Sequence, residues 1–236
     1  MNEIRAGGTA LNTSLGLAFV GGYADAASFV LARTFTGHLT GNCVLAAVSA
    51  AGNDWPLTLD RLLAVMAFLA GILFSMILHR LVPARLRPSG LAIAMAVEVL
   101  LFVSAFLCLT NRAHEGPFIA CMCLALGIQN GALSKTKGIS VHSTYMTGMV
   151  TTLTQKSFDY LALEPSPPEG VSTPSARLTI QVLAWMWVSF IFGAVAGAAL
   201  ASSLHSLGLL GLALGLLLLT FAEVRTNLPV HDAAPG

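Results

Sequence analysis

Charged side chains are scarce in this 236-residue sequence. Asp, Glu, Lys and Arg together make up 10% of it, whereas in soluble domains they make up about a quarter. Apolar residues reach 56%, and the mean hydropathy is +0.78. This composition excludes an ordinary soluble globular protein. The net charge of +1 gives no electrostatic basis for binding nucleic acid, so we expect no nucleic-acid partner.

Cysteine and the common catalytic motifs are equally sparse. The four cysteines all fall inside apolar runs, where a thiol usually serves as a small buried hydrophobe. No ligand cluster has metal-binding spacing, so we expect neither metal nor cofactor. The sequence has no nucleophile–base pair, HExxH motif or carboxylate pair, which argues against an enzyme. It also lacks a P-loop, so ATP is not expected to drive any transport.

Long apolar runs are what the sequence has instead. Four runs are nearly free of charge: Leu62–Leu81, Leu91–Leu109, Leu178–Leu200 and Leu207–Ala222. Two further runs, Leu15–Ala32 and Phe118–Leu133, are long enough to span but carry polar residues. A helix needs roughly 20 residues to cross the hydrocarbon core of a bilayer. We therefore predict an all-α integral membrane protein whose main partner is the lipid bilayer.

Two shorter segments begin with a Thr-Gly pair and are of uncertain reach. Residues 37–52 contain Thr40-Gly41-Asn42, and residues 143–155, for which Ser143 is a good N-cap, contain Thr147-Gly148. A helix of about 16 residues is about 24 Å long, short of the ~30 Å core. These segments are either half-helices beside six spans or crossing helices in an arrangement of seven or eight spans.

The distribution of Lys and Arg favours half-helices. With six spans, nine of the twelve basic residues lie on one side and only Arg33, Arg61 and Arg112 on the other, whereas eight spans divide them evenly. Basic residues concentrate on the cytoplasmic side of membrane proteins. We therefore expect both termini in the cytoplasm. The two halves, residues 1–112 and 113–236, then form inverted repeats within one membrane domain.

Matches between the halves recur in the same order. Gly21 matches Gly127, Thr40-Gly41 matches Thr147-Gly148, and Phe68 matches Phe190. Each half also has a pair of small residues four positions apart, Gly71 with Ser75 and Gly193 with Gly197, a spacing typical of close helix packing in membranes. The shared order favours duplication.

Several of these motifs resemble a known family. Gly21–Ala26 (Gly-Gly-Tyr-Ala-Asp-Ala), Thr36–Asn42 (Thr-Gly-His-Leu-Thr-Gly-Asn), Gly127–Asn130 and Thr144–Gly148 are similar to the YoaK-type family of bacterial multi-pass membrane proteins, whose domain has no assigned function. The resemblance covers nearly the whole chain. It implies a bacterial cytoplasmic-membrane protein of about six or seven helices, and it implies no substrate. Met149 stands where the first half has Asn42, so the second motif is an incomplete copy.

Polar residues within the apolar segments are the candidate site. A carboxylate in the membrane core is costly and is read as functional by default, which directs attention to Asp25 and Glu98. Free N–H groups at the start of a half-helix can bind a polar or anionic group. The predicted substrate-binding residues are Tyr23, Asp25, Thr40, Gly41, Asn42, Gln129, Asn130, Thr147 and Gly148. Glu98 is assigned either a proton-binding or a structural role.

We therefore predict a small gradient-driven secondary transporter or permease for a small polar or anionic solute, with its site between the repeats. The alternative is a non-transporting membrane protein that binds or assembles with partners through its small-residue faces. The sequence leaves open whether identical chains associate.

Overall fold

A computed structural model describes residues 11–81, 90–110, 115–133, 135–136, 138–141, 146–162 and 175–227. These residues form eight α-helices, one 3-10 turn (His205–Leu207) and a two-stranded hairpin. The helices are α1 (Leu11–Ala32), α2 (Leu39–Ala51), α3 (Trp55–Leu81), α4 (Gly90–Thr110), α5 (Glu115–Ala132), α6 (Met146–Leu161), α7 (Ala176–Leu204) and α8 (Gly208–Asn227). The expected N-cap residue of the second short segment, Ser143, lies outside the described residues.

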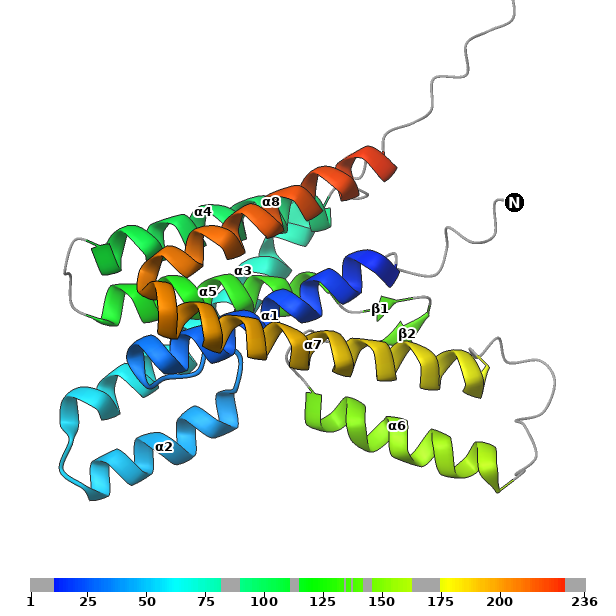
Figure 1. Ribbon diagram of the computed structural model, residues 1–236, viewed down its shortest axis with the longest axis horizontal. Helices are drawn as coiled ribbons and strands as arrows, with labels where there is room; N and C mark the ends of the chain where they lie inside the picture. The colour runs from blue at the N-terminus through cyan, green and yellow to red at the C-terminus, as the bar shows by residue number, and fades with distance from the viewer. Residues whose placement is uncertain are drawn as a thin grey trace, which may run out of the picture.

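Four stretches of the described chain are long and apolar enough to cross a membrane: Leu11–Ala32, Trp55–Leu81, Gly90–Thr110 and Ala176–Arg225. The last of these contains α7 and α8, which turn near His205, where φ is +50°, and run back antiparallel (Figure 1). It therefore supplies two membrane-length helices. The prediction of an all-α membrane protein is confirmed.

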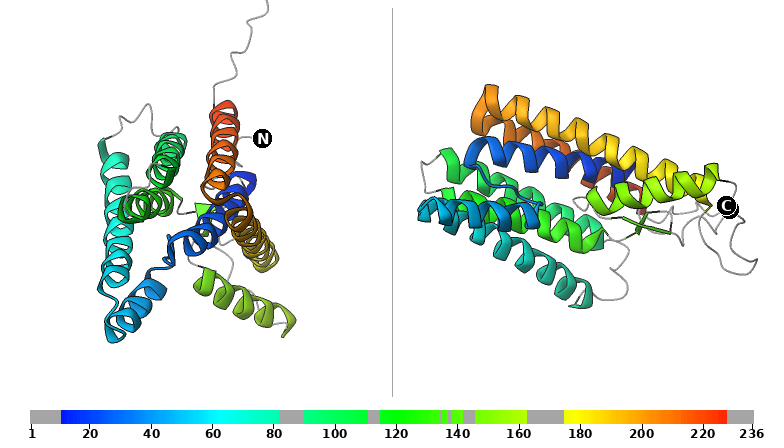
Figure 2. Two further views of the ribbon diagram at one scale, coloured as in Figure 1. Left: turned by 60° about the vertical axis from the view of Figure 1, so that its left-hand side comes forward. Right: turned by 90° about the horizontal axis from the view of Figure 1, so that it is seen from below.

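The short helices α2 and α6 do not run the length of the bundle. Each begins near the middle of the molecule, and the two diverge toward opposite ends (Figures 1 and 2). They have 13 and 16 residues, so they extend about 20 and 24 Å at ~1.5 Å per residue. The chain thus returns to the middle after α1 and again after α5, and each short helix leads back out to the end from which the chain came.

The long helices pair across the two halves of the chain rather than within them. Helix α1 packs along α7, α3 packs along α5, and α4 lies between α5 and α8. In the left view of Figure 2, α3, α4 and α5 form one group and α1, α7 and α8 form another. The short helices instead pack within their own halves, α2 on α3 and α6 on α7.

Glycines allow the cross-half pairs to approach backbone to backbone. A methyl group on Gly127 of α5 would overlap the carbonyl oxygen of Phe68 in α3, and one on Gly22 of α1 would overlap the carbonyl oxygen of Phe190 in α7. Gly71 and Gly193 meet neighbouring backbone in the same way. The small-residue pairs of the sequence are therefore packing positions, as predicted.

A hairpin that the sequence did not predict follows α5. Strands β1 (Lys135–Thr136) and β2 (Ile139–Ser140) pair antiparallel, and Gly138 provides the turn with a φ of +79° that glycine adopts readily. The Thr136 hydroxyl lies 2.5 Å from the hydroxyl of Ser14 at the start of α1. The hairpin thereby ties the end of α5 to the first turn of α1.

Candidate functional site

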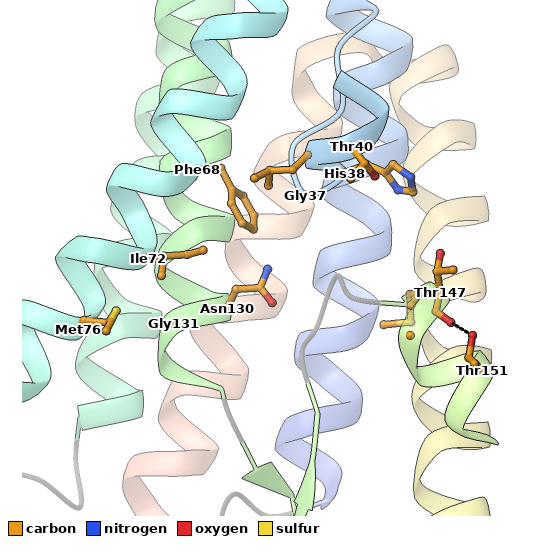
Figure 3. A pocket seen from close by; sticks show the side chains of 13 residues that line it. Gly37, His38, Thr40, Phe68, Ile72, Met76, Asn130, Gly131, Thr147 and Thr151 are labelled. Atoms are coloured by element: carbon orange, nitrogen blue, oxygen red, sulfur yellow. Dashed lines mark hydrogen bonds between the residues drawn. The ribbon is translucent and has the colours of Figure 1, made fainter. Parts of the chain in front are cut away.

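A cavity of about 920 Å³ lies where the two short helices begin. Four elements meet there: the start of α2, the start of α6, one face of α3 and the end of α5 (Figure 3). Polar lining residues are His38, Thr40, Asn130, Thr147 and Thr151, and apolar ones include Phe68, Ile72 and Met76. Both Thr-Gly segments therefore contribute to one space in the middle of the molecule.

Asp25 holds the start of α2 in place. Its Oδ1 atom accepts hydrogen bonds from the backbone N–H of Thr36 (2.8 Å), the hydroxyl of Thr36 (3.0 Å) and the backbone N–H of Gly37 (2.6 Å). Two of these donors are backbone groups of the segment that returns from α1 to the cavity. Asp25 is only 6% exposed, so little water is available to take its place as the acceptor. The carboxylate satisfies those donors and fixes the return of the chain.

Asn42 closes the same loop from the other side. Its side-chain amide donates to the carbonyl oxygen of Phe35 at 2.8 Å, and its Oδ1 atom accepts from the backbone N–H of Phe35 at 3.0 Å. Gly41 leaves room for the imidazole of His38, because a Cβ atom at Gly41 would lie 2.5 Å from the His38 ring. Asn42 and Gly41 thus shape the loop that presents His38 and Thr40 to the cavity.

The outer end of α2 is anchored by Arg61 of α3. The guanidinium donates to the carbonyl oxygen of Leu45 at 2.5 Å and to that of Arg33 at 3.4 Å. The hydroxyls of Ser49 and Thr58 lie 2.9 Å apart and join the same two helices. From the sequence, Arg61 is assigned only to a side of the membrane; a lone arginine directly before the apolar run Leu62–Leu81 is the signal that the sequence offers.

Gln129 and Tyr23 are directed at neighbouring helices rather than at the cavity. The Gln129 amide donates to the carbonyl oxygen of Leu17 in α1 at 2.9 Å, and the Tyr23 hydroxyl donates to the carbonyl oxygen of Gly208 at 2.8 Å. Both side chains are buried. They join helices from different halves of the chain.

Of the nine predicted binding residues, four line the cavity: Thr40, Asn130, Thr147 and Gly148. The other five, Tyr23, Asp25, Gly41, Asn42 and Gln129, position the helices and loop around it. A solute-binding role for any of the nine stays a prediction. The apolar wall of Phe68, Ile72 and Met76 was not predicted from the sequence, although their spacing of four places them on one face of α3.

Glu98 lies apart from the cavity, in α4. Its side chain is fully buried, and neither carboxylate oxygen has a hydrogen-bond partner among the described residues. Helix α4 packs against α5 and α8. Such a group costs free energy unless it is protonated or finds a ligand.

The lining mixes polar and apolar side chains. None of the described lining residues is Asp, Glu, Lys or Arg. Hydroxyls and an amide can donate or accept hydrogen bonds, and the starts of two helices add a partial positive potential. Elsewhere in the described ranges, no three His, Cys, Asp or Glu side chains gather closely enough to hold a metal ion.

Comparison with known proteins identifies relatives but no function. A protein that the chain resembles is the UPF0700 transmembrane protein YoaK of Bacillus subtilis (strain 168), which is 29% identical over 148 residues, or 60% of this chain and 65% of the relative. The match therefore spans less than two thirds of that protein. No solved structure matches the chain. Residues 13–222 match the family described as "Protein of unknown function (DUF1275)". Since this match includes all eight helices in whole or in large part, the chain belongs to the DUF1275 family of membrane proteins.

Proposed function

We propose that this protein is a secondary transporter or permease for a small polar or anionic solute, with its binding site in the cavity between the starts of α2 and α6. The convergence of two interrupted segments on one cavity carries the proposal (Figure 3). Many secondary transporters bind their substrate at such a place, where discontinuous helices of two repeats meet near the middle of the membrane.

Inverted duplication of residues 1–112 and 113–236 fits the packing. Exchanging α1, α2, α3 and α4 for α5, α6, α7 and α8 turns the α1–α7 pair into the α5–α3 pair and the α2–α3 pair into the α6–α7 pair. The close contact of Gly127 with Phe68 likewise becomes that of Gly22 with Phe190. This comparison aligns Gly22, rather than the Gly21 chosen from sequence, with Gly127, and it thereby aligns Asp25 with Asn130.

The lining favours a particular range of solutes. A cation would find no carboxylate among the described lining residues, and desolvating it there would be costly. A neutral polar molecule or a monovalent anion would meet donors on Thr40, Asn130 and Thr147 and the N-terminal ends of two helices. The apolar wall of α3 would accept a short hydrocarbon portion.

Basic residues support an orientation in the membrane. The end of the molecule where α3, α6 and α8 finish and α7 begins (Figure 1) holds Arg80, Lys156, Arg177 and Arg225, whereas Arg33 and Arg61 belong to the opposite end. The positive-inside rule assigns the first end to the cytoplasm. The proposed location is the bacterial cytoplasmic membrane, with both termini inside.

Flux through reconstituted protein tests the proposal. Proteoliposomes would be exposed to osmotic gradients of glycerol, urea, acetate or lactate, and solute influx would be followed by light scattering. Thr147→Phe places a bulky ring in the cavity and should abolish any protein-dependent influx. Thr152→Phe is the matched control, because Thr152 is an exposed residue of the same helix that lies outside the cavity lining and about 140° around the helix from Thr147.

Two results would overturn the proposal. One is the absence of protein-dependent influx for every probe, and the other is equal influx through the Thr147→Phe and Thr152→Phe variants. If the protein showed no influx and purified in a stable complex with another membrane protein, the alternative function of binding or assembling with partners would be favoured instead.

A further inference from the structure

The exposed surfaces of the two short helices differ in chemistry along their length. Thr40 of α2 and Thr147 of α6 both line the cavity. Beyond the cavity, the exposed residues of α2 are apolar: Cys43, Val44, Ala47, Val48 and Ala51. Val44 and Val48, which follow Thr40 at intervals of four, are 63% and 62% exposed. Residues four apart share one face of a helix, so the face that leads away from the cavity along α2 is hydrocarbon.

The equivalent face of α6 is polar. Thr147 and Thr151 line the cavity, and the same interval of four continues to Gln155 and Asp159. Thr147, Thr151 and Gln155 are exposed. Beside them Lys156 forms an ion pair with Asp159 at 3.5 Å, with both side chains about half exposed. Hydroxyl, amide and charged groups therefore lead from the cavity to the outer end of α6, with the exposed ring of Phe158 beside them.

The residues of this face differ in the medium they require. The hydroxyls of Thr151 and Thr154 bond to carbonyl oxygens one turn back, so these residues tolerate lipid as well as water. Gln155, Lys156 and Asp159 are different, because exposing such groups to hydrocarbon costs several kcal/mol. Helix α6 buries only Met149 and makes its main helix–helix contact with α7, so no other described helix packs extensively over this face.

We propose that the polar face of α6 forms the wall of an aqueous path that joins the cavity to the side of the membrane at which α6 ends, and that no such path follows α2. The structure is thus open toward one side, the one that carries Lys156 and Arg177 and that the positive-inside rule assigns to the cytoplasm. The inference rests on the proposed transport function for its solute, while its geometry is tested without any solute.

Thiol labelling from the two sides of the membrane tests the path. Thr151→Cys and Gln155→Cys supply exposed probes on α6, and the native Cys43 and Val48→Cys supply exposed probes on α2. Sealed spheroplasts and inverted membrane vesicles would be treated with a membrane-impermeant, positively charged methanethiosulfonate reagent. Peptide mass spectrometry would then measure the modification of each cysteine in the full-length chain.

We expect both α6 probes to react from the cytoplasmic side at least about tenfold faster than either α2 probe, because a thiol in hydrocarbon stays protonated and unreactive. Failure of both α6 probes to react from either side would overturn the path, whether lipid or another protein covers the helix. Equal reaction of Val48→Cys and Gln155→Cys would overturn its one-sidedness. Because Cys43 is native, the α2 measurement does not depend on a variant that folds poorly.

The result is separable from the transport proposal. Labelling of α6 without flux in any proteoliposome assay would retain the aqueous path and reject the transporter. Flux that is blocked by Thr147→Phe, with α6 unlabelled, would retain the transporter and reject the path.

Discussion

The carboxylate of Asp25 accepts the backbone N–H of Gly37 at 2.6 Å, across a loop that brings the chain back into the middle of the molecule. The same Oδ1 atom accepts two further hydrogen bonds from Thr36. An acidic residue that its place in an apolar segment marks as a candidate binding group therefore anchors the start of α2. The two roles make different demands on the side chain and can be separated.

Replacing Asp25 distinguishes anchoring from charge. Asp25→Ala removes the acceptor and leaves two backbone N–H groups without it, so we expect the free energy of unfolding to fall by about 2–4 kcal/mol. Asp25→Asn keeps an oxygen in place of Oδ1 and should retain most of that stability. Thermal unfolding of the detergent-purified variants gives the comparison. A loss with Asn as large as that with Ala would show that the negative charge itself is required.

The backbone contacts between α3 and α5 should tolerate no side chain. In Gly127→Ala the new methyl group would overlap the Phe68 carbonyl oxygen, and the helices would have to separate. We expect a loss of about 1–3 kcal/mol from this overpacking, seen as a lower melting temperature and a smaller monodisperse fraction on size-exclusion chromatography. Gly211→Ala is the control, since nothing lies within 4 Å of that position. It should be neutral or stabilising by up to about 1 kcal/mol. Equal effects of the two substitutions would contradict the contact.

Glu98 should be a destabilising residue. Both of its carboxylate oxygens are buried without a partner among the described residues, so Glu98→Leu removes an unsatisfied polar group and should raise the free energy of unfolding by about 1–3 kcal/mol. Glu98→Gln keeps a polar group there and should gain less. A lower melting temperature for Glu98→Leu would instead indicate that the carboxyl binds a proton-sharing partner or a ligand that stabilises the fold.

If α2 and α6 do not cross the membrane, the side from which single introduced cysteines can be labelled is predicted. Ser140 in β2 and Ser175 before α7 are exposed at the same end of the molecule, and Gly52 after α2 is exposed at the other. Cysteines at 140 and 175 should therefore be labelled by an impermeant maleimide from one side, and a cysteine at 52 from the opposite side. If α6 crossed the membrane, the cysteines at 140 and 175 would face opposite sides.

The sequence predicts the spans well because each is a run of apolar residues whose length matches a bilayer. The short reach of α2 and α6 also follows from the sequence, through residue counts and the placement of Lys and Arg. Both inferences depend on properties of a single segment. They need no knowledge of which segment packs against which.

The sequence does not predict which distant segments pack against each other. Gln129 and Asn130 are adjacent polar residues of one helix, yet Gln129 bonds to the Leu17 carbonyl while Asn130 lines the cavity. Helical rotation of about 100° per residue separates them, but only the position of α1 decides which one meets a neighbour. The roles of Tyr23 and Arg61 depend on distant carbonyl groups in the same way.

The packing of α1 on α7 has a consequence for biosynthesis. Ala32, the last residue of α1, precedes Ala176, the first residue of α7, by 144 positions. At ~5–20 residues per second, roughly 7 to 30 seconds pass before the ribosome has made even the start of the partner helix. Throughout that interval the glycine-lined seam of α1 faces lipid or the insertion machinery. A chain that stops after its first half has no partner for this seam, and membrane quality control should recognise it as an orphan.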